Sequence, residues 1–170
     1  FKGRVQYYEL WNEPNNGNVP VQYIKVPDYI NLVKRVVPVI RQEDPEAKIV
    51  VGSVVLQYDQ DYFFELLRSE EIMPLGDVLN WHALFSRSPA SELQEDREYY
   101  YDYPSIVQAI KDTASAHGFE GEYYAEAGWA SPQFTGTPDQ TLHTKIQAAK
   151  YYARTIVRHL GMDVWIELGE

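Results

Sequence analysis

Apolar and polar residues alternate along the chain in blocks that predict strands and helices in turn. Continuous apolar runs bounded by turn residues are typical of strands covered on both faces, and apolar residues spaced three and four apart are typical of amphipathic helices. Runs of the first kind predict five strands, over residues 5–12, 49–56, 77–85, 121–128 and 164–168.

Helical spacing fills the intervals between these strands. Helices are predicted after Asp28 as an N-cap, and over residues 62–68, 105–117 and 139–160. The last is the longest, and Thr137 with Gln140 resembles a capping box that opens it. Its apolar positions define one face: Leu142, Ile146, Ala149, Ala153, Ile156, Val157 and Leu160. The acidic, tyrosine-rich segment up to Pro104 is predicted to be a long loop.

The order of elements is therefore βαβαβαβαβ, which is typical of an α/β fold with a parallel sheet wrapped by helices. Two architectures satisfy this order: a five-stranded doubly wound sheet, or five consecutive strands of a (β/α)8 TIM barrel. No glycine-rich phosphate fingerprint follows any strand, which weakens the doubly wound alternative. No repeat or linker divides residues 1–170, so one domain is predicted.

Composition excludes several classes of partner. The formal net charge of −10 disfavours nucleic acid and anionic membranes. Cysteine is absent, and no apolar run approaches the roughly 20 residues of a membrane-spanning helix. The sequence starts with no signal peptide, so localisation stays open. Aromatic residues make up 14% of the chain, which suits a cleft in which flat rings stack on sugars.

Residues that can do chemistry gather at the ends of the predicted strands. The candidates are Asn12 and Glu13 after the first strand, His82 in the third, Glu126 and Trp129 at the end of the fourth, and Trp165 in the fifth. Ligands bind at the carboxyl ends of parallel strands, so these side chains should converge. Two carboxyls with an amide and an imidazole suit hydrolysis of a glycosidic bond.

Two motifs give this set a specific resemblance. Residues 8–15 read YELWNEPN and resemble the fourth-strand motif of glycoside hydrolase clan A, the retaining (β/α)8-barrel glycosidases. Residues 124–129 read YAEAGW and are similar to the clan's seventh-strand motif, while residues 77–85 and 164–168 are similar to its sixth and eighth strands. The resemblance thus covers strands four to eight, the C-terminal part of the catalytic barrel.

The resemblance implies a role for each candidate. Glu13 would be the general acid/base, Glu126 the nucleophile, and Asn12 a hydrogen-bond partner of the sugar 2-hydroxyl. His82 would contact the catalytic carboxyls, and Trp165 would be an aromatic platform for the sugar. Trp129 is a second candidate platform.

The implied reaction is a double displacement on an O-glycosidic bond of a carbohydrate, and a β linkage is expected. It requires the pKa of Glu13 to be raised by its ionised neighbour and by burial, the pKa of Glu126 to be held low by hydrogen bonds, and a separation of ~5–5.5 Å between the two carboxyls. No spacing of His, Asp and Glu is typical of a metal site, so no metal or cofactor is expected.

Structural explanations compete with each assignment. Glu13 could be a loop acid beside a turn, Glu126 a salt-bridge partner at a strand end, and His82 a satisfied structural residue. His117, His143 and His159 lie on or beside helices and are expected at the surface. From a different functional class, the chain could be a carbohydrate-binding or assembly module that lacks turnover.

The length of the chain also bears on its function. A complete (β/α)8 barrel takes about 250 residues, against 170 here. Five strands do not close a barrel, so the first and last strands should have bare edges. The expected partners are therefore a carbohydrate and either the remainder of a barrel or another copy of the chain, and the chain alone could be inactive.

Overall fold

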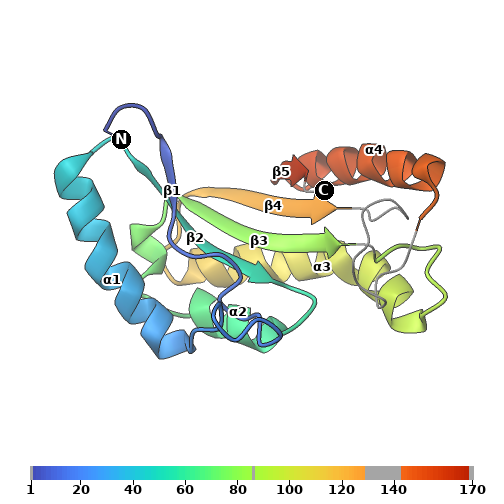
Figure 1. The fold of residues 1–170 in the computed structure, drawn as a ribbon, viewed down its shortest axis with the longest axis horizontal. Coiled ribbons are helices and arrows are strands. Elements are labelled where there is room, and N and C mark those ends of the chain that lie inside the picture. Colours follow the sequence, from blue (N-terminus) through green and yellow to red (C-terminus); the bar gives the residue numbers. More distant parts are fainter. Residues whose placement is uncertain (1, 86, 129–142, 169–170) are drawn as a thin grey trace. The chain divides into compact units, whose positions relative to one another are not determined.

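The computed structural model describes residues 2–85, 87–128 and 143–168. Strands and helices alternate along it as the hydrophobic pattern predicts (Figure 1). The strands are β1 (Tyr7–Glu9), β2 (Lys48–Val55), β3 (Val78–Phe85), β4 (Glu122–Gly128) and β5 (Trp165–Leu168). The helices are α1 (Val26–Glu43), α2 (Gln60–Leu67), α3 (Gln94–Ala116) and α4 (Lys145–Gly161), with a short 3₁₀ helix η1 (Met73–Leu75) before β3.

The five strands are parallel and form one sheet in the order β1-β2-β3-β4-β5. Tyr7 pairs with Lys48 at one end of this order, and Tyr124 pairs with Trp165 at the other. Strands of a barrel wall follow one another in sequence, whereas the order of a doubly wound sheet reverses at its switch point. The predicted fold class, a partial (β/α)8 barrel, is confirmed.

The chain divides into two compact units. The first comprises Phe1–Trp81 and Ile110–Tyr123, and the second comprises His82–Ala109 and Tyr124–Glu170. β3, β4 and α3 therefore contribute residues to both units. The predicted single domain over residues 1–170 remains a prediction.

The core of the first unit forms around β2. Every residue of β2 except Lys48 is buried, as expected for a strand covered on both faces. The strand is irregular at Gly52, whose φ is 98°, and at Ser53, whose φ is 51°. A β-carbon at Gly52 would lie 2.5 Å from the carbonyl oxygen of Asn80, so glycine is required where β2 passes β3. The N–H of Gly52 donates to the buried hydroxyl of Tyr29 at 2.9 Å.

Three element boundaries differ from the sequence prediction. β1 is three residues long, pairs with β2 and ends before the turn at Glu13. It is largely exposed, with Tyr7 45% exposed. Lys25, not Asp28, occupies the N-cap of α1, and Asp28 lies in the first turn. The segment up to Pro104 is not a loop throughout, since α3 begins at Gln94 and is longer than α4.

α3 begins early because its tyrosines find partners. The hydroxyl of half-buried Tyr99 donates to the carbonyl oxygen of Ala83 in β3 at 2.9 Å, and desolvation raises the pKa of Tyr99. Tyr103 is fully buried and its hydroxyl lies 2.8 Å from Nε2 of His159 in α4. Nδ1 of His159 donates to the carbonyl of Thr155 at 2.8 Å, so Nε2 accepts the proton of the Tyr103 hydroxyl.

The surface positions predicted for two histidines are wrong. His159 is fully buried, and His143 is 2% exposed with Nε2 lying 2.8 Å from Oγ of Ser88. His117 is half-buried. Nε2 of each of the two buried rings lies within hydrogen-bond distance of a hydroxyl oxygen, which lowers the cost of burying an imidazole.

α4 presents a different face to the core from its most apolar one. The helix begins after Thr144, which forms a capping box with Gln147, whereas the predicted caps Thr137 and Gln140 lie outside the described residues. Its buried positions are Ala148, Tyr151, Thr155 and His159. Ile146 and Val157 of the predicted apolar face are 69% and 72% exposed. The contact between Tyr103 and His159 fixes which side faces inward.

Replacement of Gly52 tests the irregular point in β2. We expect Gly52→Ala to lower the free energy of unfolding by about 2 kcal/mol or more, because a β-carbon is strained at this φ and meets the Asn80 carbonyl. The matched control is Gly17→Ala, since a β-carbon at Gly17 meets nothing within 4 Å. Urea unfolding followed by circular dichroism measures both, and equal effects would contradict the steric explanation.

The buried imidazole of His159 should make stability depend on pH. Burial lowers the pKa of His159 to about 4, whereas the unfolded chain takes up this proton below about pH 6.5. The unfolded state thus binds more protons between these values, and the free energy of unfolding falls as pH drops from 6.5 to 4, by about 3 kcal/mol.

The measurement for His159 is urea unfolding at a series of pH values. We expect His159→Gln to remove this part of the slope, with His117→Gln as the control that keeps it. An unchanged slope in His159→Gln would show that other groups set the acid sensitivity.

Candidate active site

Glu13 stands at an irregular point of the backbone just beyond β1. Its φ is 50°, the left-handed region that residues with a β-carbon rarely adopt. Its N–H donates to the carbonyl of Ser53 at 3.0 Å, and its carbonyl accepts the N–H of Asn16 at 3.0 Å. The side chain is half-buried. A left-handed residue held from both sides is typical of functional sites, where such strain persists because the surroundings enforce it.

Two asparagines after Glu13 hold this turn in place. The buried side chain of Asn15 pairs with the backbone of Val55 at the end of β2: Nδ2 donates to its carbonyl at 2.9 Å, and Oδ1 accepts its N–H at 2.9 Å. Nδ2 of Asn16, also buried, donates to Oε2 of Glu13 at 2.7 Å. The turn is thereby fastened to β2, and one oxygen of the glutamate is fixed.

Asn12 precedes the turn and is exposed. The indole of neighbouring Trp11 donates from Nε1 to the carbonyl of Gln22 at 2.8 Å, which attaches the following loop to the end of β1. The side-chain amide of Asn12 is therefore accessible from solvent.

The second unit brings two predicted site residues together. Nε2 of His82, in β3, lies 3.2 Å from Oε2 of Glu126, in β4. The His82 side chain is 5% exposed and that of Glu126 is 27% exposed, so the imidazole is enclosed while the carboxyl reaches solvent. An N–H at Nε2 donates to the carboxylate in either the neutral tautomer that carries it or the imidazolium. The contact orients the carboxyl of Glu126.

Register places Trp165 away from the level of Glu126. Trp165 is the first residue of β5 and pairs with Tyr124, their rings 6.4 Å apart, while Glu126 pairs with Glu167. A step of two residues is about 6.6 Å along a strand, so Trp165 lies toward the amino end. It is 58% exposed. Trp129 lies outside the described residues.

The predicted residues therefore fall into two local groups. Asn12 and Glu13 belong to the first unit, and His82, Glu126 and Trp165 belong to the second. Sequence reasoning missed Asn16, which touches the Glu13 carboxyl, and Ser53, which holds its main chain. An isolated Gly52 inside an apolar strand was the available signal for an irregular point there.

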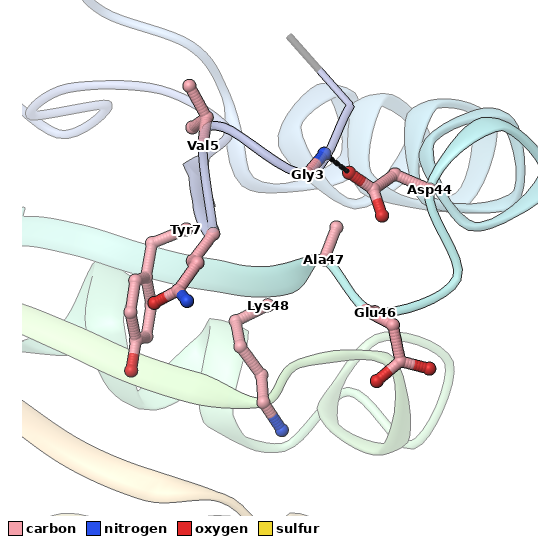
Figure 2. A pocket seen from close by; sticks show the side chains of 8 residues that line it. Gly3, Val5, Tyr7, Asp44, Glu46, Ala47 and Lys48 are labelled. Atoms are coloured by element: carbon pink, nitrogen blue, oxygen red, sulfur yellow. Dashed lines mark hydrogen bonds between the residues drawn. The ribbon is translucent and has the colours of Figure 1, made fainter.

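One hollow in the first unit lies at the opposite end of β1 and β2 from Glu13. Its volume is about 310 Å³, and Tyr7, Asp44, Glu46 and Lys48 are among its lining residues (Figure 2). Figure 2 also shows the carboxylate of Asp44 accepting the N–H of Gly3, at 3.0 Å. Active sites of parallel α/β folds lie at the carboxyl ends of strands, so this hollow is not the candidate site.

Within residues 2–85, 87–128 and 143–168, no group of three or more His, Asp or Glu side chains is placed to hold a metal ion. Over the same ranges, no helix combines the length and apolar character needed to cross a bilayer.

The fold of the chain is similar to that of solved glycoside hydrolases. A glycoside hydrolase family 44 endoglucanase produced by Clostridium acetobutylium ATCC 824 matches with a TM-score of 0.65 at 12% identity, over 97% of this chain and 42% of its own. A family 44 xyloglucanase from Paenibacillus polymyxa matches with a TM-score of 0.66 at 12% identity and the same coverages, both alone and in its structure with xyloglucan.

This likeness shows a shared fold. The chain spans 42% of the length of these solved chains. No protein-family profile matches the sequence, and no curated protein matches it significantly.

Removal of the Asn15 side chain tests how the Glu13 turn is fastened. We expect Asn15→Ala to lower the free energy of unfolding by about 2 to 3 kcal/mol, because the buried N–H and carbonyl of Val55 lose their partner. Asn18→Ala, at an exposed position of the same loop, should change it by less than about 0.5 kcal/mol. Urea unfolding distinguishes the two; a similar small effect in both variants would show that Asn15 does not anchor the turn.

Proposed function

We propose that this chain belongs to the catalytic barrel of a retaining glycoside hydrolase, in which Glu126 is the nucleophile and Glu13 the general acid/base. The observation that carries the proposal is the contact between His82 and Glu126, which joins two residues that the sequence predicts for one site. The fold shared with two family 44 glycosidases supports it, as does the left-handed backbone at Glu13.

The chemistry follows from two carboxyls in different states. In the first step an oxygen of Glu126 bonds to the anomeric carbon while the glycosidic bond breaks, and Glu13 gives its proton to the leaving oxygen. In the second step Glu13 takes a proton from water, the water oxygen bonds to the anomeric carbon, and the ester to Glu126 breaks. The configuration of the sugar is retained after two inversions.

The local environments suit these roles. The nucleophile must be ionised, and Nε2 of His82 lies 3.2 Å from Oε2 of Glu126, where an N–H on that nitrogen would stabilise the carboxylate. The acid/base must both lose and regain a proton, which requires some contact with solvent. Glu13 is half-buried and lies on a turn rather than in a strand of the sheet. Asn12 is proposed to bind the sugar 2-hydroxyl, and Trp129 and Trp165 remain proposed platforms.

The proposed substrate class is a β-linked glucan. The two solved relatives in fold are named an endoglucanase and a xyloglucanase, and one was solved with xyloglucan. Retention requires the two carboxyls to lie ~5–5.5 Å apart when a sugar is bound, which a crystal structure with a glucan oligosaccharide would measure.

Hydrolysis of aryl β-glucosides and aryl β-cello-oligosaccharides tests the assignment. We expect wild-type protein to release the phenol with retention, and Glu126→Gly to be slower by at least about a thousandfold. Azide should restore turnover in Glu126→Gly and yield the α-glycosyl azide, because a small anion replaces the missing carboxylate.

The control for that experiment is Glu122→Gln, at the exposed amino end of β4, which should keep wild-type activity. Full activity in Glu126→Gly would overturn the proposal. Sugar binding without turnover in wild-type protein would instead support a non-catalytic carbohydrate-binding module.

A further inference from the structure

The amide of Asn16 is oriented by its own hydrogen bonds. Oδ1 accepts the backbone N–H of Asn18 at 3.1 Å, and Nδ2 donates to Oε2 of Glu13 at 2.7 Å. A flipped amide would set its NH₂ group against the N–H of Asn18, two donors facing each other. The loop therefore aims an N–H donor at Glu13, and Asn16 is 6% exposed, so the bond is shielded from bulk water.

The same residue also holds the main chain of Glu13. The backbone N–H of Asn16 donates to the Glu13 carbonyl at 3.0 Å, and Ser53 accepts the Glu13 N–H from the other side. The left-handed φ of 50° at Glu13 sets the direction in which its side chain leaves the backbone. Backbone and carboxyl are thus fixed together, through residues that are neutral: Asn16 from the turn and Ser53 from β2.

We propose that Asn16 is a positioning residue that holds Oε2 of Glu13 as a hydrogen-bond acceptor and so fixes the direction of the carboxyl that transfers the proton. The inference rests on the proposed function, in which Glu13 is the acid/base.

This arrangement has a consequence for the proton equilibrium of Glu13. An N–H donor favours the ionised carboxylate over the protonated acid. Asn16 therefore makes Glu13 a stronger acid, which favours transfer of the proton to the leaving group but lowers the fraction of Glu13 that is protonated at neutral pH. Replacement of the donor should move the titration of Glu13 to higher pH.

Asn16→Asp is the informative variant because it keeps the shape of the side chain. Aspartate still accepts the Asn18 N–H, but it replaces the donor to Glu13 with a second carboxylate. We expect the titration midpoint of Glu13 to rise by at least about one pH unit, since two adjacent carboxylates resist ionising together. Asn16→Ser, whose shorter hydroxyl does not reach Oε2, should raise it by about half a unit or more.

The titration is followed by NMR of the full chain labelled with ¹³C at the glutamate carboxyl, and Glu13→Gln identifies the resonance. The matched control is Asn18→Asp, which adds the same charge at an exposed position of the loop. Its Glu13 midpoint should stay within about 0.3 units of wild type. Thermal melting confirms that each variant is folded, and Asn16→Ser serves alone if Asn16→Asp does not fold.

Enzyme kinetics supply the second readout. In Asn16→Asp the alkaline limb of the pH profile of kcat/KM should rise with the Glu13 midpoint, while the acidic limb stays in place. A Glu13 midpoint that is unchanged in the Asn16 variants, or equally shifted in Asn18→Asp, would overturn the inference. A shifted midpoint in a protein that hydrolyses no glycoside would leave the contact established and refute the proposed function instead.

Discussion

The hydrogen bond from the N–H of Glu13 to the carbonyl of Ser53 is the constraint on which the candidate site of the first unit depends. Both residues have left-handed φ values, 50° and 51°, and each such residue costs about 1–2 kcal/mol. The surrounding contacts offset this cost. Asn15 pairs with the backbone at the end of β2, and Gly52 lets β2 pass close to the carbonyl of Asn80. The strained turn at Glu13 is therefore held in place by its contacts with β2.

Glu126 is held by a different principle. It lies in regular β4, which pairs in parallel with β5, and its carboxyl meets the imidazole of His82 on the neighbouring strand. Its direction is therefore set by strand register, in which alternate side chains point to the same face. The proposed acid/base, Glu13, lies on a polar turn, whereas the proposed nucleophile, Glu126, lies on a strand beside an imidazole.

The sequence predicted which segments form strands more accurately than it predicted where the elements begin and end. Apolar runs report burial on both faces, so β2 and β3 were found nearly to the residue. The start of α3 was missed because Tyr99 and Tyr103 look polar in a periodicity count, and their burial depends on distant partners, Ala83 and His159. Glu13 and Glu126 were visible through their motifs. Asn16 was not, because an asparagine after Pro14 is an ordinary turn signal whether or not it touches a carboxylate.

Each carboxylate is oriented by contacts within its own unit. For Glu13 these come from the turn and from β2, and for Glu126 from β3. The two acids can thus keep their local geometry independently, whereas double displacement needs both on one sugar at a separation of ~5–5.5 Å. The orientation of each acid is therefore a local property of this sequence. The Glu13 titration reports this local geometry alone, whereas the proposed activity also requires both acids on one sugar.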